Sequence, residues 1–229
     1  MVRLKSFFDH LVFGVCSLDV GARWLEERLG VPLAPGGEHL KMGTHNRLLR
    51  LGQSSYLELI AINPLGEKPG RPRWFGLDAV SPEDLATPRL LTWVASTPNI
   101  AKTADQADYH PGGIQAMSRN SLNWLITIPD DGSLVAGGLL PSLIEWPAGV
   151  HPSQLLPERG VYLEELELYT PDPMGVERSL ESIGVYPAVN HIRILPDDGG
   201  TRQRACLATK HEAIWFDSPD STGNRVFPA

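Results

Sequence analysis

One ordered pattern occurs twice in this chain, and it constrains the fold more than any other feature. Residues 36–52 read GGEHLKMGTHNRLLRLG, and residues 112–129 read GGIQAMSRNSLNWLITIP. Both stretches contain a Gly-Gly pair, then a polar segment with a methionine, then an asparagine before an apolar run. Their spacing exceeds the roughly 20 to 50 residues of a solenoid repeat, so we predict a duplicated supersecondary unit.

The elements around the first copy predict a βαβββ unit. Residues 7–13, FFDHLVF, are rich in aromatic and β-branched residues, as in a buried strand. Residues 17–30, SLDVGARWLEERLG, begin with a capping candidate, place Val20 and other apolar side chains at helical spacing, and end in glycine. This segment is predicted to be an amphipathic helix. A turn at residues 35–37 and a strand meander ending in SSYLELIAI complete the unit.

The same order starts again at residue 89 with RLLTWVAS, followed by a capped helix and, after the second pattern, by PSLIEW in the place of SSYLELIAI. A third start near residue 161 has a strand, a helix and a hairpin, which predicts a partial βαββ unit. The predicted fold class is α+β with tandem βαβββ modules. The predicted segments are residues 1–64 for the first module, 65–88 for a proline-rich connection or lid, 89–155 for the second module and 156–229 for the partial unit.

Composition excludes several classes of protein. Hydrophobic residues make up 42% of the 229 residues and charged residues 21%, which is typical of a packed fold rather than of a disordered chain. The net charge of −7 disfavours binding to nucleic acid or to an anionic membrane. No run approaches the roughly 20 apolar residues of a membrane span. The two cysteines, Cys16 and Cys206, are expected to be reduced, and the protein to be soluble and cytoplasmic.

Two polar residues lie inside apolar strand patterns. Alternation puts His10 on one strand face with Phe8 and Val12, and Glu58 shares a face with Tyr56. A buried imidazole needs hydrogen-bond partners or a metal, and a buried carboxylate needs a partner for its charge. The plainer alternatives are a core histidine bonded to a neighbouring strand and a solvent-facing glutamate. Glu145 occupies the matching place in the second unit, which favours a functional site.

Taken together, DHLVF, the following SLD helix, the GGEHLKMGTHNRLLRLG stretch, YLELIAINP and LIEWPAGVHPS resemble the glyoxalase-like branch of the vicinal oxygen chelate superfamily, which includes glyoxalases, bleomycin resistance proteins and dioxygenases. The resemblance covers residues 7–153. It implies paired modules whose mixed sheets curl into a partly closed barrel around a cavity. In enzymes of the superfamily, this cavity holds a divalent metal bound by inward residues on the first and last strands of each module.

Carried over position by position, the resemblance implies metal ligands at His10, Glu58 and Glu145, with Glu58 and Glu145 as catalytic carboxylates. The fourth position falls near Thr92, where the family pattern has a stronger ligand. One imidazole and two carboxylates suit Fe, Mn, Ni or Zn. No nucleotide cofactor is expected, because the phosphate-loop and dinucleotide glycine motifs are absent. The predicted substrate-binding residues are His39, His45, Asn46, Tyr56, Trp93 and Trp146.

Two functions stay open on this basis. The first is a metal-dependent lyase, isomerase or dioxygenase acting on a small oxygen-rich or aromatic metabolite. The second, favoured by Thr92, is a metal-free protein of the same fold that binds an antibiotic or metabolite. In both, the partner is a small molecule, and pairing of modules within or between chains makes a homodimer one option.

Overall fold

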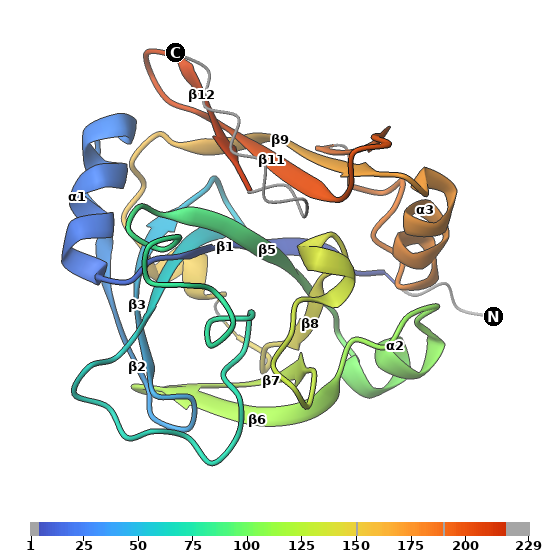
Figure 1. Ribbon diagram of the computed structural model, residues 1–229, viewed down its shortest axis with the longest axis horizontal. Coiled ribbons are helices and arrows are strands. Elements are labelled where there is room, and N and C mark those ends of the chain that lie inside the picture. Colours follow the sequence, from blue (N-terminus) through green and yellow to red (C-terminus); the bar gives the residue numbers. More distant parts are fainter. Residues whose placement is uncertain (1–4, 150, 190, 219–229) are drawn as a thin grey trace.

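The computed structural model describes residues 5–149, 151–189 and 191–218 (Figure 1). The larger sheet contains β1 (Phe7–Gly14), β2 (Ala34–His39), β3 (Thr44–Arg50), β4 (Tyr56–Ile62), β5 (Arg89–Ser96), β6 (Gly113–Arg119), β7 (Leu122–Ile128) and β8 (Ser142–Glu145). The smaller sheet contains β9 (Tyr162–Thr170), β10 (Ile192–Pro196), β11 (Arg202–Ala208) and β12 (Ala213–Asp217). The helices are α1 (Leu18–Leu29), α2 (Ile100–Gln106) and α3 (Pro173–Ser182), with short 3-10 turns η1 (Val135–Gly138) and η2 (Pro152–Leu155).

The eight-stranded sheet curls so that its two end strands approach each other. Its order is β2-β3-β4-β1-β5-β8-β7-β6, with β1 parallel to β4 and antiparallel to β5. Figure 1 shows the two end strands, β2 and β6, side by side at the seam where the curl closes. Near this seam, Lys41 Nζ donates to the carbonyl of Ala116 at 2.8 Å. The predicted α+β fold with curled mixed sheets is therefore confirmed.

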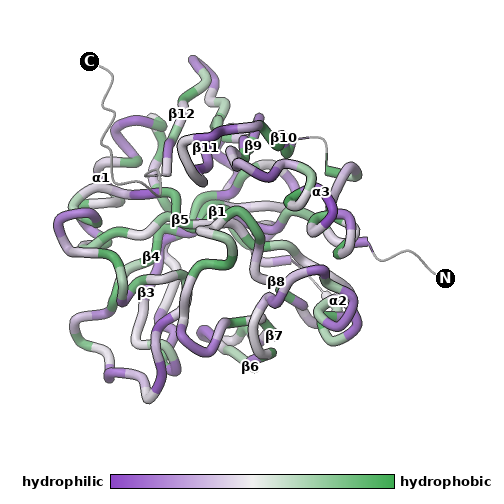
Figure 2. The backbone as a smooth tube through the Cα atoms, turned by 45° about the vertical axis from the view of Figure 1, so that its right-hand side comes forward, coloured by the Kyte–Doolittle hydropathy of each residue, from purple (hydrophilic) through white to green (hydrophobic). Residues whose placement is uncertain are grey.

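Two apolar clusters lie on the two faces of this sheet. The outer cluster lies beneath α1 and the smaller sheet, and it includes Leu11, Leu25 and Leu166. The inner cluster fills the curl and includes Val12 and Ile60. Figure 2 shows that hydrophobic positions concentrate on β1, β4 and β5, the central strands that contribute side chains to both faces. Only polar side chains on the inner face can therefore form a site inside the barrel.

Helix α1 follows the predicted pattern at its ends but not along its whole face. It starts after Ser17, and its C-terminal cap is Gly30 in the left-handed conformation at φ 68°. Such a cap is most favourable for glycine, which has no Cβ. Leu18 and Leu25 face the sheet, whereas Val20, which was expected on the apolar face, is 45% exposed.

Strand β1 contains a bulge at Asp9 that changes which side chains face inward. Phe8 pairs with Ala95 and His10 with Val94, so Asp9 is the extra residue. Phe8 consequently packs in the outer cluster and not beside His10, which corrects the expected alternation. The expected turn at residues 35–37 is also wrong, because these residues lie within β2.

The proline-rich segment between β4 and β5 packs into the open barrel. Trp74 and Phe75 from this segment are buried in the inner cluster. The indole of Trp74 meets the ring of His39 edge-on, with centroids 4.9 Å apart. This packing supports the idea of a lid, while the exact domain boundaries stay a prediction.

The C-terminal region is more complete than the predicted βαββ unit. Its sheet has the order β10-β9-β11-β12, and β10, which was not expected, pairs in parallel with β9. Figure 1 shows this sheet lying across one side of the larger one. Gln203 Nε2 joins the two sheets by donating to the carbonyl of Leu91 at 2.7 Å. Residues 219–229 of the predicted unit lie outside the described residues.

None of the described helices has the length and apolar character that a membrane crossing requires. Cys16 and Cys206 are free, as expected for reduced thiols. The homodimer and the cellular location stay predictions.

Candidate functional site

The structure brings His10 and Glu58 together on the inner face of the barrel. His10 Nε2 lies 3.6 Å from Glu58 Oε2, and both residues are buried. The ring of His10 stacks on Tyr56, with centroids 4.4 Å apart and an angle of 15° between the planes. Adjacent parallel strands produce this arrangement, because Tyr56 is the β4 partner of His10 and Glu58 is the partner of Val12. The predicted inward pair thus exists.

A second histidine approaches the other oxygen of Glu58. His39 Nε2 lies 3.9 Å from Glu58 Oε1, and Asn46 Nδ2 donates to the same oxygen at 2.5 Å. His39 Nδ1 pairs with Thr44 Oγ1 at 3.1 Å, so we assign the ring proton to Nδ1. The remaining nitrogen, Nε2, makes a long 3.5 Å contact with Asn46 Nδ2 besides its approach to Glu58. Glu58 is therefore a buried carboxylate between two imidazoles.

Asp9 is a member of the cluster that the sequence pattern did not reveal. Its Oδ1 pairs with His10 Nδ1 at 2.7 Å, and its Oδ2 accepts from Trp146 Nε1 at 3.0 Å. The same Oδ2 lies 3.0 Å from His151 Nε2. The bulge in β1 allows the adjacent Asp9 and His10 to interact directly. The sequence did contain one sign of this role, because Asp9 is a charged residue inside an otherwise apolar strand.

Burial and charge set the protonation of this cluster. For Glu58, burial opposes ionisation, but the nearby His10 ring, 3.6 Å away, and the charges of His39 and Arg119 lower its pKa to about 2. The pKa of Asp9 is likewise about 2, because its histidine partners outweigh its burial. Burial alone would lower the pKa of His10, but Asp9 and Glu58 raise it. Burial lowers the pKa of His39 to about 4, so this ring is neutral at neutral pH.

Glu145 is not part of the cluster. Its Oε2 accepts a hydrogen bond from the backbone N–H of Ile100 at 2.7 Å, at the first turn of α2. On β8 the inner cluster includes Ile144 and the strand's neighbour Trp146, so Glu145, which alternates with them, faces the helix. The glutamate therefore caps a helix N-terminus, a position that favours a negative charge.

Strand register explains why the repeat was misleading at this position. If Thr92 corresponds to His10, then two residues further on Val94 corresponds to Val12. The parallel partner of Val12 is Glu58, whereas the parallel partner of Val94 is Ser142. Ser142, not Glu145, is therefore the counterpart of Glu58.

The residues of the predicted metal site do not fit a metal as a set. Thr92 uses its hydroxyl to donate to the carbonyl of Gly138 at 3.0 Å, and Glu145 is engaged at α2. Across the described part of the chain, no group of three or more histidine, cysteine, aspartate or glutamate side chains is arranged to hold a metal ion. We therefore derive the chemistry of the site from the side chains themselves.

The Glu145→Ala variant is expected to unfold more easily by about 1 kcal/mol, because it leaves the N–H of Ile100 without its acceptor. Urea unfolding monitored by circular dichroism measures this loss. A variant as stable as the wild type, or one that also loses the ligand binding of the barrel, would contradict the capping role.

The predicted substrate-binding residues separate into two groups. His39, Asn46, Tyr56 and Trp146 all contact members of the buried cluster. Trp93 does not: it lies in the outer cluster, and its Nε1 donates to the carbonyl of Leu139. His45 lines a separate open groove of about 630 Å³ beside the start of α1. These two residues belong to other parts of the structure.

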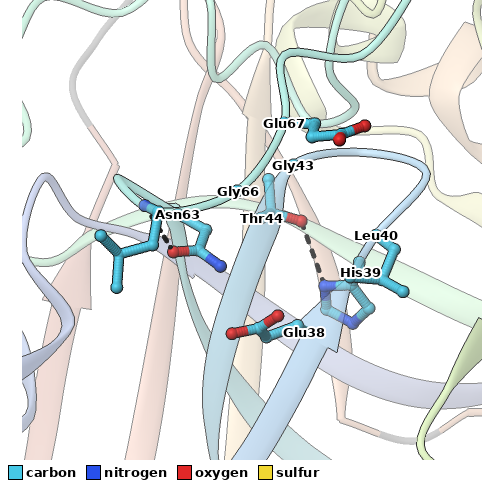
Figure 3. A pocket seen from close by; sticks show the side chains of 9 residues that line it. Glu38, His39, Leu40, Gly43, Thr44, Asn63, Gly66 and Glu67 are labelled. Carbon is cyan, nitrogen blue, oxygen red and sulfur yellow. Dashed lines mark hydrogen bonds between the residues drawn. The ribbon is translucent and has the colours of Figure 1, made fainter.

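A cavity of about 340 Å³ reaches His39 from the surface (Figure 3). Figure 3 shows His39 and Thr44 from the β2 and β3 hairpin on one side and Asn63 with the following segment on the other. The lining residues are Glu38, His39, Leu40, Gly43, Thr44, Asn63, Leu65, Gly66 and Glu67. His39 lines the cavity and also approaches Glu58, so its ring lies between the cavity and the buried carboxylate.

Comparison with known proteins agrees with this geometry. The model of the glyoxalase-like domain family matches residues 8–184, most of the chain. The chain therefore belongs to the glyoxalase-like domain family, as the sequence resemblance implied.

Among solved structures, a hypothetical protein from Staphylococcus aureus matches with a TM-score of 0.59 and 15% identity, over 95% of this chain and 87% of the other. Methylmalonyl-CoA epimerase from Mycobacterium tuberculosis matches with a TM-score of 0.40 and 19% identity, over 64% and 92% of the two chains. At 15% identity the first match supports the fold but not a function. The TM-score of the second match is too low to support a conclusion about this chain. No curated protein sequence matches the chain.

Proposed function

We propose that this protein is an isomerase or lyase that moves a proton on a small polar metabolite bound next to His39. The observation that carries the proposal is a buried, ionised carboxylate, Glu58, held between two imidazoles, one of which lines a cavity. Burying such a cluster in an apolar barrel costs free energy, which favours a functional role over a structural one. Perturbed titratable groups that line a cavity are typical of catalytic sites.

In this proposal His39 accepts the proton. Its Nε2 carries the lone pair, and the lowered pKa keeps the ring neutral at neutral pH. When Nε2 takes a proton from a carbon next to a carbonyl group, the new imidazolium faces Glu58 Oε1, which is already charged. Glu58 thus stabilises charge that develops only during the reaction, and this lowers the barrier. His10, whose pKa is raised by Asp9 and Glu58, pairs with Glu58 and favours its ionised form.

The test is exchange of carbon-bound protons in D₂O, followed by proton NMR over a panel of 2-oxo acids, 2-hydroxy aldehydes and acyl thioesters. Wild-type protein is expected to exchange at least one of these compounds, and Glu58→Gln to slow that exchange by about 100-fold or more. Glu145→Gln is the matched control, because it makes the same chemical change outside the cluster. It is expected to keep the wild-type rate.

Other outcomes are equally informative. Equal loss in the Glu58 and Glu145 variants would contradict the proposal and restore the set implied by the family resemblance. A panel compound that raises the melting temperature but never exchanges would favour the second candidate, a metal-free binding protein. The observation in favour of that candidate is the pair Thr92 and Ser142, which occupy the places of His10 and Glu58 in the second module.

A further inference from the structure

Arg119, the last residue of β6, is a buried cation without a direct partner. Only 6% of the residue is exposed. Within the described residues, its guanidinium makes no hydrogen bond and no ion pair. The charges of the barrel cluster, in contrast, are paired: Asp9 with His10, and Glu58 with His10 and Asn46. The nitrogens of this guanidinium are not among the fully enclosed, unpaired polar atoms of the described residues, so its donors stay accessible to solvent or to a ligand.

The side chain of Arg119 crosses the seam where the barrel closes. A Cβ added at Gly37 of β2 would lie 2.8 Å from Arg119 Cγ and 3.1 Å from Cδ, so the stem of the arginine lies flat on this glycine. The next residue, Asn120, has φ 53° and donates from Nδ2 to the carbonyl of Gly36 at 3.4 Å. The seam thus positions the arginine rather than leaving it loose on the surface.

Arg119 lies on the inner face of the barrel, because alternation along β6 puts it on the same face as Met117, which belongs to the inner cluster. Its charge lowers the pKa values of Glu58 and His39, which places it within electrostatic reach of both. Within the described residues no ion pair joins Arg119 to Glu58, whose polar partners are His10, His39 and Asn46. The donors of Arg119 are therefore close to the reacting groups and remain available to a ligand.

We propose that Arg119 binds a carboxylate group of the substrate, so that the protein acts on a small carboxylic acid. This inference rests on the proposed function, because it assigns the substrate class of that same site. The planar guanidinium matches a carboxylate with two parallel hydrogen bonds. In this proposal, the carbon next to that carboxylate is the one that loses its proton to His39.

The charges around the site favour a carboxylate over a phosphate. Two ionised carboxylates, Asp9 and Glu58, lie in the barrel, and Glu38 and Glu67 line the cavity. A doubly charged phosphate would meet more repulsion from these groups than a singly charged carboxylate. The site is therefore expected to discriminate by charge as well as by shape.

The test compares binding of matched pairs of compounds, each a 2-oxo or 2-hydroxy acid and its primary amide, by calorimetric titration. The wild type is expected to bind the acid of at least one pair about 10- to 100-fold more tightly than the amide. Arg119→Gln is expected to lose this preference, and Arg119→Lys to keep part of it. Arg47→Gln is the matched control, since Arg47 pairs with Asp19 outside the barrel and its loss is expected to leave the preference unchanged.

Three results would overturn the assignment: equal binding of acid and amide by the wild type, an unchanged preference in folded Arg119→Gln or Arg119→Lys protein, or tighter binding of inorganic phosphate than of any acid. Circular dichroism establishes that each variant is folded. The readout is separate from proton exchange. If acids bind through Arg119 but show no proton exchange that depends on Glu58, the proposed function is refuted and the role of Arg119 stands. If proton exchange depends on Glu58 but is unchanged in Arg119→Gln, the role of Arg119 is refuted and the proposed function stands.

Discussion

The Asp9→Ala variant is expected to lose about 3–5 kcal/mol of unfolding free energy at pH 7, the typical effect of removing one partner from a buried ion pair. Asp9 is fully buried and ionised, and it accepts from Trp146 as well as pairing with His10. Its removal leaves His10 with only the more distant Glu58 and leaves the Trp146 N–H without an acceptor. Both consequences act on the folded state.

Chemical unfolding monitored by tryptophan fluorescence measures this change. Asp19→Ala is the matched control, because Asp19 is an exposed aspartate paired with Arg47, and such surface pairs typically contribute about 1 kcal/mol or less. If the Asp9 and Asp19 variants were equally stable, the buried pair would not contribute as we infer. Asp9→Asn, which keeps the shape and one acceptor oxygen, is expected to lose less than Asp9→Ala.

Stability is expected to fall as the pH decreases from 6.5 towards 4, by roughly 3 kcal/mol in total, because of His39. Burial lowers the pKa of His39 to about 4 from an ordinary value of 6.5. The unfolded chain therefore binds a proton on this residue at a higher pH than the folded protein does. Its contribution is fully present above pH 6.5 and is lost as the pH falls towards the folded value.

The other titratable members of the buried cluster act in different pH windows. His10 has a raised pKa, so the stability it contributes is present below pH 6.5 and is lost only as the pH rises through its folded pKa. Asp9 and Glu58 have pKa values of about 2, so their contributions are lost below the unfolded values of 3.8 and 4.5. Between about pH 6.5 and 5 the slope thus reports His39 together with His45, a partly buried histidine whose pKa is also lowered by burial.

The measurement is a series of urea unfolding curves at half-unit pH steps. His39→Gln is expected to flatten the dependence between pH 6.5 and 5, whereas His110→Gln, at an exposed histidine, is expected to keep the wild-type slope. A slope that persists in His39→Gln would mean that another group binds the proton in that range.

Local sequence patterns were sufficient for the repeat, the family and the first pair of site residues. Alternation along two strands brought His10 and Glu58 to the same face, because His10 and Val12 lie beyond the bulge in β1, where regular pairing with β4 resumes. The helix ends were also predictable from neighbours in the chain: Gly30 forms the C-terminal cap, and Ser17 precedes the helix, although its side chain makes no capping hydrogen bond. These features depend on interactions between residues a few positions apart, or on the strand order that the repeated pattern predicts.

The remainder of the site depended on tertiary structure. A shift of one residue reverses the face of a strand, so the similar motifs around Glu58 and Glu145 could not reveal that only Glu58 faces inward. His151 meets Asp9 across 142 positions of the chain, and Arg119 reaches Gly37 only because the end strands converge. Short-range periodicity carries no information about such closures. The sequence therefore established the module and its first two inward polar residues, while the curl of the sheet decided which other side chains join them.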